Sequence, residues 1–155
     1  MKFSSWLSKW NLDSIKINAK IIEAELSFSE VDKKAAWELY IELLTRVTTQ
    51  ELGDSDGDEE TALKSIHSLF TTTRTILKEN GRGCTEFTKI AIPILNQVVR
   101  PFTAEWHRIL INNQLQNKAI EFRKDLSKLQ VILKNYAKLL SDIAEVEDLT
   151  DLENV

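Results

Sequence analysis

The chain has 155 residues, 43% hydrophobic and 28% charged, with a formal net charge of -4. These values are typical of one globular domain. The negative net charge argues against a protein whose surface as a whole is basic and binds nucleic acid. The single cysteine excludes an internal disulfide, and no stretch has the roughly 18 uncharged apolar residues of a membrane span or the apolar core of a secretory signal. We therefore expect a cytoplasmic, mainly α protein, with no metal or cofactor implied.

Residues 1–28 predict an N-terminal arm. Four apolar residues in the first ten share one face of a short helix: Phe3, Trp6, Leu7 and Trp10. We expect this helix to pack on the domain's own core, the alternative being a membrane surface or a partner. Residues 12–28 alternate apolar and polar positions in two runs that meet near 18–20, which favours a β-hairpin, although a helix through Ile15 and Leu26 also fits.

Two long helices are predicted next. Ser29 is placed to cap the first, and its apolar spacing continues to about Gln50. Asp58 is placed to cap the second, which should end near Asn80 with Gly81 in the left-handed conformation.

The acidic stretch between these helices, residues 51–60, has some features of a calcium loop. Such a loop needs glycine at its sixth position and glutamate at its twelfth. If the loop starts at Asp54, these positions hold Glu59 and Ser65, so the motif fails and we interpret the stretch as a connector.

His67 and Arg74 lie seven residues apart on the second helix and project together at the edge of its apolar stripe. A ligand-binding pair is one interpretation. We favour a histidine and an arginine at the rim of the core, because a metal site would need more ligands than the sequence supplies nearby.

The segment from Gly81 to Asn113 is the most apolar long stretch and predicts a central helix, kinked or divided at Pro93 and Pro101. Its apolar face is centred on Ile94, Val98 and Phe102, and an unbroken helical wheel places Glu105 within that face. The opposite side carries a polar line, which with Arg82 is the predicted binding surface: Lys89, Asn96, Arg100, Thr103 and His107.

Arg82 lies in a glycine-containing turn, Gly81 to Thr85, that leads into this helix. Free backbone N–H groups at a helix start can bind an anion or a nucleotide phosphate. A plain connection between helices is the interpretation we favour, because no strand precedes the turn and it lacks the lysine of a phosphate-binding loop. Cys84 could be a reactive thiol at this helix start, although a structural role is favoured.

Residues 118–145 predict the last long helix, whose apolar positions alternate at spacings of four and three residues. Packing within a bundle is the favoured interpretation, and a dimer seam is the alternative. We predict a four-helix antiparallel bundle over 29–146, with a kinked third helix. Residues 147–155 are expected to form an acidic tail that is solvated or presents Val146, Leu149 and Leu152 to a partner.

Arg100 and His107 have the spacing R-x6-H, which resembles the motif of HEPN nucleases. These are all-helical ribonucleases that act as dimers without a metal. The resemblance implies that Arg100 binds a phosphate and that His107 assists proton transfer at a dimer cleft. The position after the arginine, often polar in that family, is Pro101 here.

Four segments together resemble a set of uncharacterised helical proteins associated with bacterial defence and conflict systems: AAWELY (35–40), TRVTTQ (45–50), GRGC (81–84) and LNQVVRPFTAEWH (95–107). The resemblance implies a module that senses or partners another component, and no catalytic residues follow from it. Our leading prediction is therefore a non-enzymatic protein-interaction module, and a HEPN-like ribonuclease using Arg100 and His107 is the alternative.

Overall fold

The computed structural model of the protein describes residues 1–46, 48–49 and 58–154. Over these residues the chain forms helices and no β-strand, which confirms the all-α fold class. The α-helices are α1 (Phe3–Lys9), α2 (Ala19–Ile22), α3 (Glu30–Leu44), α4 (Glu59–Asn80), α5 (Thr85–Ile94), α6 (Arg100–Ile111) and α7 (Ala119–Ala144). Short 3-10 segments are η1 (Gly81–Cys84), η3 (Gln116–Lys118) and η4 (Thr150–Asn154), and η2 (Leu95–Val99) is a π-helical turn.

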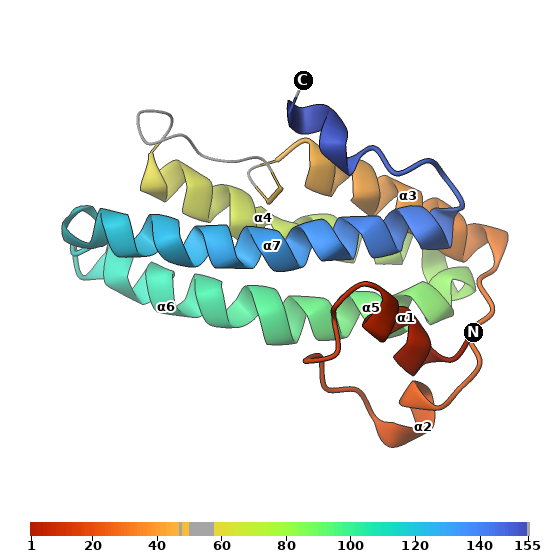
Figure 1. Cartoon of the computed structure of the whole chain (residues 1–155). Coiled ribbons are helices and arrows are strands. Elements are labelled where there is room, and N and C mark those ends of the chain that lie inside the picture. Colours follow the sequence, from red (N-terminus) through yellow and green to blue (C-terminus); the bar gives the residue numbers. More distant parts are fainter. Residues whose placement is uncertain (47, 50–57, 155) are drawn as a thin grey trace.

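The long helices lie side by side around one hydrophobic core (Figure 1). Helix α3 packs along α7 and also contacts α4 and α5, while α6 contacts both α4 and α7. The apolar positions predicted for the last helix are all buried in this core: Phe122, Leu126, Leu129, Leu133, Tyr136, Leu140 and Ile143. Helix α4 is therefore flanked by α3 on one side and α6 on the other.

Helix α3 begins as predicted. The hydroxyl of Ser29 accepts a hydrogen bond from the Asp32 N–H, and the Asp32 carboxylate accepts one from the Ser29 N–H, so the two residues form a capping box. The other oxygen of Asp32 accepts a hydrogen bond from the N–H of Phe87, at 2.9 Å. This contact fixes the start of α3 to α5.

The end of α3 corrects the sequence prediction, because the helix stops at Leu44 rather than near Gln50. The hydroxyls of Thr48 and Thr49 both donate to the carbonyl oxygen of Leu43, at 2.6 and 3.0 Å. These side chains satisfy a carbonyl that a longer helix would have bonded to a backbone N–H, so they favour termination. Gln50 and most of the predicted connector, including Asp54, lie outside the described residues.

Helix α4 is capped by Asp58 and ends at Asn80, both as predicted. Gly81 has a positive φ of 71° but a ψ of -158°, so it does not adopt the left-handed helical conformation expected for it. Only glycine reaches this backbone region readily, and the sharp change of direction there turns the chain from α4 into α5.

The hairpin expected in residues 12–28 does not form. The Asn18 side chain instead accepts a hydrogen bond from the Lys20 N–H and caps the single helical turn α2. A polar side chain that bonds its own backbone in this way competes with strand pairing, and the described arm contains only an isolated bridge between Lys2 and Glu25. Helix α1 packs on the core as expected, through buried Phe3 and Leu7 together with half-buried aromatic neighbours.

The C-terminal segment folds back on the domain at Leu149 and Thr150, while Val146 and Leu152 are exposed. Glu145 ends α7 in the left-handed conformation and pairs with Lys33 of α3 at 3.0 Å. The Leu149 N–H then donates to the Tyr40 hydroxyl, and Thr150 is buried. Burial raises the pKa of the Tyr40 phenol, although the Leu149 hydrogen bond opposes this shift.

The central segment is one helical run from Thr85 to Ile111 with a π turn in the middle, so of the two predicted outcomes, a kink or a division at the prolines, the division does not occur. Within the turn, the N–H of Arg100 donates to the carbonyl oxygen five residues back, on Leu95. Pro101 follows in the first turn of α6, where its missing N–H is tolerated more easily.

The π turn inserts one extra residue, which rotates the following helix by about 100° relative to an unbroken wheel. Val99 is therefore fully buried where Val98 was expected to be. Beyond the turn, Trp106 and Thr103 face the core and Glu105 is exposed, which corrects the predicted positions of Thr103 and Glu105.

Candidate functional site

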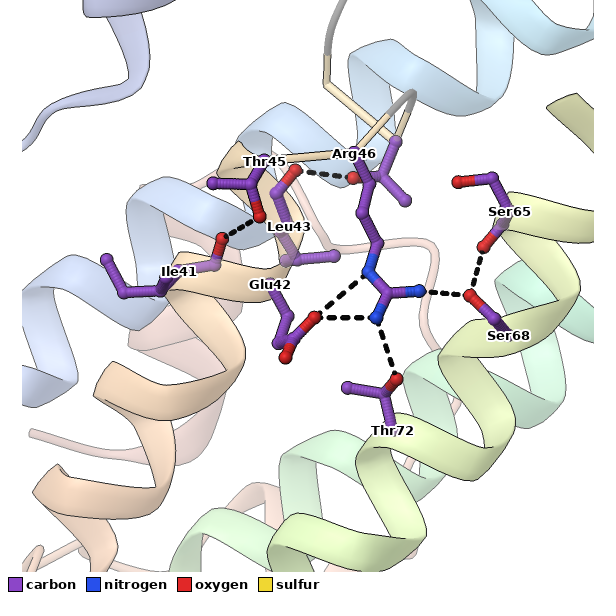
Figure 2. A network of polar contacts seen from close by, with 9 residues as sticks. Ile41, Glu42, Leu43, Thr45, Arg46, Ser65, Ser68 and Thr72 are labelled. Carbon is purple, nitrogen blue, oxygen red and sulfur yellow. Dashed lines mark hydrogen bonds and ion pairs between the residues drawn. The ribbon is translucent and has the colours of Figure 1, made fainter.

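Arg46 at the end of α3 fixes one side of α4. Its guanidinium donates two hydrogen bonds to the Glu42 carboxylate, at 3.0 and 2.6 Å, and also reaches across to the hydroxyls of Ser68 and Thr72 on α4 (Figure 2). Ser68 in turn donates to the carbonyl oxygen of Ser65. The Glu42–Arg46 pair therefore links α3 to α4.

Helix α6 is held against α7 by aromatic packing. The rings of Phe102 and Trp106 lie 5.6 and 5.2 Å from the ring of Phe122 on α7, measured between centroids. The indole N–H of Trp106 donates to the Asp125 carboxylate at 3.3 Å. Helix α4 is thus bound to α3 and helix α6 to α7. A groove lies between α4 and α6.

The groove between α4 and α6 has two compartments. The cationic compartment, of about 230 Å³, is lined by His67, Phe70, Arg74, Arg100, Thr103, Ala104 and His107. The apolar compartment, of about 330 Å³, is lined by Leu63, Lys64, His67, Ser68, Thr71, Thr103, His107 and Leu110. Since His67, Thr103 and His107 line both, the two compartments are contiguous and meet at the histidines.

Positive charge is concentrated in the cationic compartment. The Arg100 guanidinium carbon lies 4.7 Å from the centroid of the Phe70 ring, and its N–H groups donate to the Asn96 side-chain oxygen at 3.2 and 3.1 Å. These contacts hold the guanidinium in place without neutralising its charge. Arg74 forms no ion pair with any residue that the structure describes.

Neither compartment is lined by an aspartate or a glutamate among the described residues. Lys64 of the apolar lining is paired with Glu60 at 3.2 Å. Two arginines and two exposed histidines thus share a carboxylate-free surface in a chain with a net charge of -4. Such an arrangement produces a local positive potential that attracts anions.

The structure brings together two pairs that the sequence showed separately. Arg100 and His107 on α6 were predicted as site residues, while His67 and Arg74 on α4 were interpreted as rim residues. Both pairs are spaced by seven residues, in opposite order, and α6 runs back along α4 (Figure 1). This reversal explains why all four side chains line one compartment, and the matched spacing is the sequence signal that could have identified the cluster.

Other predicted residues of the binding surface lie elsewhere or are engaged. Lys89 pairs with Glu86 at 2.7 Å, and Arg82 lies in η1, so neither lines the groove. Asn96 supports Arg100 without lining a compartment. Cys84 is fully buried and its thiol donates to the Gly81 carbonyl oxygen at 3.2 Å, an environment that favours the structural role.

A larger groove, of about 470 Å³, lies between α3 and α4 and includes Trp37, Ile41 and three glutamates. Two of these are already engaged, because Glu38 accepts a hydrogen bond from Asn80 and Glu42 is bound by Arg46. This groove therefore presents fewer unsatisfied charged groups than the one between α4 and α6.

Within the described part of the chain, no cluster of three or more histidine, cysteine, aspartate or glutamate side chains is arranged to hold a metal ion. None of the described helices is both long and apolar enough to cross a membrane. Comparisons with protein-family models, curated proteins and solved structures gave no match to this chain.

Proposed function

We propose that the protein is a non-enzymatic interaction or sensing module that recognises an anionic group in the groove between α4 and α6. One observation carries this proposal: Arg74 and Arg100, on different helices, line the same compartment with both histidines of the chain and with no described carboxylate. Like charges placed together disfavour each other, and a bound anion would remove that repulsion.

The arginines suit this role for geometric reasons. A guanidinium offers a planar set of N–H donors that can bind a phosphate or carboxylate through two parallel hydrogen bonds. The Phe70 ring and Asn96 restrict the position of Arg100 before a ligand arrives, which lowers the entropic cost of binding. His67 and His107 can add N–H donors at the entrance to the apolar compartment.

The cellular context we propose is a bacterial defence or conflict system in the cytoplasm. This part rests on the sequence resemblance of the four segments from AAWELY to LNQVVRPFTAEWH. We also propose that α3, α4, the α5–η2–α6 helix and α7 make up an antiparallel four-helix bundle, which the contacts among them support.

The test is a phosphate titration of the purified protein by calorimetry at low ionic strength. Loss of a hydrogen bond to a charged group costs about 1.5–3 kcal/mol, so we expect Arg74→Ala and Arg100→Ala each to weaken binding about 10-fold or more. Lys78→Ala removes the same charge from α4 outside the groove and should leave the affinity unchanged. Equal effects of all three variants, or no binding by the wild type, would contradict the proposal.

A second candidate is a HEPN-like metal-independent ribonuclease. The observation that favours it is the presence of His67 and His107 in one compartment with Arg100, because two imidazoles can act as general base and general acid while an arginine stabilises charge on the phosphate. If His67→Ala, His107→Ala and Arg100→Ala each abolish cleavage of an RNA panel without unfolding the protein, the protein is a ribonuclease and the hypothesis of a non-enzymatic module is wrong.

The resemblance to these nucleases further implies a homodimer. Light scattering of the wild-type protein across a concentration series would measure its molecular mass directly. A monomer at every concentration, with no cleavage of the RNA panel, would eliminate the ribonuclease candidate.

A further inference from the structure

We infer that the ligand of the groove is a small nucleotide-like molecule, with its phosphate in the cationic compartment and its ring in the apolar compartment. The inference rests on the proposed anion recognition and adds the chemical class of the ligand. It comes from the two-part shape of the groove, which anion binding alone would not require.

The dimensions suit a small molecule. Pockets that bind small ligands measure about 300–1,000 Å³ and combine an apolar lining with a few polar groups. The apolar compartment alone is about 330 Å³, and it lies next to the cationic compartment of about 230 Å³, with His67, Thr103 and His107 lining both. A ligand that fills both must therefore carry an anionic group next to a less polar body.

The lining favours a ring over an acyl chain in the apolar compartment. Leu63 and Leu110 supply aliphatic surface, and the flat imidazoles of His67 and His107 at the boundary can lie against a ring face. The Thr71 hydroxyl has no hydrogen-bond partner among the described residues and can bond a ring edge. A saturated chain has no polar edge that could form this hydrogen bond.

The charges favour a phosphate over a carboxylate. Arg74 and Arg100 approach the compartment from two helices, and a phosphate monoester has enough oxygen acceptors for both guanidiniums. A phosphate monoester carries a charge of about -1.5 to -2 at pH 7, whereas a carboxylate carries a single negative charge and balances only one guanidinium. One arginine would then keep an uncompensated charge beside the ligand.

The experiment compares nucleotides with ligands that lack the phosphate, that lack the ring, or that carry a carboxylate on a ring. The four nucleoside 5′-monophosphates, the four nucleosides, inorganic phosphate and benzoate are titrated by calorimetry into the wild-type protein. We expect at least one monophosphate to bind about 10-fold more tightly than its nucleoside, than inorganic phosphate and than benzoate.

Two variants test which compartment binds the ring and which binds the phosphate. Thr71 is exposed and lines both the apolar compartment and the larger groove between α3 and α4, so Thr71→Trp should fold normally. A tryptophan ring seated in the apolar compartment should reduce nucleotide affinity to that of inorganic phosphate without changing phosphate binding. The double variant Arg74→Ala/Arg100→Ala should reduce nucleotide affinity to that of the nucleoside. Lys78→Ala is the charge-matched control, and circular dichroism checks the fold of each variant.

The outcomes separate this inference from the proposed function. If inorganic phosphate binds as tightly as every nucleotide and depends on the arginines, anion recognition stands and the nucleotide inference is overturned. Benzoate binding as tightly as the best nucleotide would overturn the choice of a phosphate. If no probe binds, both proposals fall.

Discussion

Replacing Arg46 by alanine should destabilise the protein more than its partly exposed position suggests. The side chain is only 24% exposed, and its guanidinium contacts Glu42 in α3 and Ser68 and Thr72 on α4. An exposed ion pair between residues four apart contributes only about 0.3–0.5 kcal/mol. Hydrogen bonds to the two α4 hydroxyls add about 0.5–1.5 kcal/mol each.

The sum for Arg46→Ala is about 1–3 kcal/mol. In a domain of this size, 1 kcal/mol shifts the melting temperature by roughly 2–4 °C. We therefore expect Tm to fall by about 5 °C, measured by circular dichroism during thermal unfolding. Urea unfolding at 25 °C should give the corresponding loss in free energy with an unchanged dependence on urea concentration.

Lys64→Ala is the matched control, because Lys64 pairs with Glu60 at the same spacing and in the same acid-first order but forms no hydrogen bond or ion pair with another helix that the structure describes. Its Tm should change by about 2 °C or less. If Arg46→Ala and Lys64→Ala have the same effect, the hydrogen bonds from α3 to α4 contribute nothing measurable, and our account of how α4 is held would be refuted.

Three further predictions concern other regions. Glu105→Ala should change the free energy of unfolding by less than about 0.5 kcal/mol, because the π turn places Glu105 in solvent; a loss of several kcal/mol would show that it faces the core. The hydrogen bond from Arg123 lowers the pKa of the Glu59 carboxyl, so the stability that this pair adds is complete above the ordinary glutamate pKa of about 4.3 and is lost as the pH falls through the lowered value. The difference in unfolding free energy between wild type and Glu59→Gln should therefore shrink in acid, and a difference independent of pH would contradict this linkage. Tyr40→Phe removes the acceptor of the Leu149 N–H and should speed hydrogen exchange at that amide, whereas unchanged exchange would show that the C-terminal segment is held by other contacts.

Local signals predicted much of the fold because their causes lie within a few residues of one another. Ser29 and Asp58 cap helices where the sequence placed them, and the apolar spacing of the last helix identified its buried face. The errors came where a side chain offers the backbone an alternative partner. Asn18 replaced a hairpin with a helical turn, and Thr48 and Thr49 ended α3 early.

The sequence predicted the polar residues that α6 contributes to the candidate site but not those of α4. A helical wheel assumes regular geometry, so it could not include the extra residue of the π turn, which buries Thr103 and exposes Glu105. The predicted line of polar residues on one helix was therefore incomplete. Its partners, His67 and Arg74, lie on α4. The packing of the whole hydrophobic core decides which helices lie side by side.

The central claim is that the groove between α4 and α6 binds an anion through Arg74 and Arg100. The most direct measurement is an NMR titration with inorganic phosphate that follows the arginine Nε–Hε signals and the histidine ring signals. We predict saturable shifts for Arg74, Arg100, His67 and His107, and none for Arg82, an exposed arginine outside the groove. Shifts of equal size at Arg82, or no saturable shift at Arg74 and Arg100, would contradict the claim.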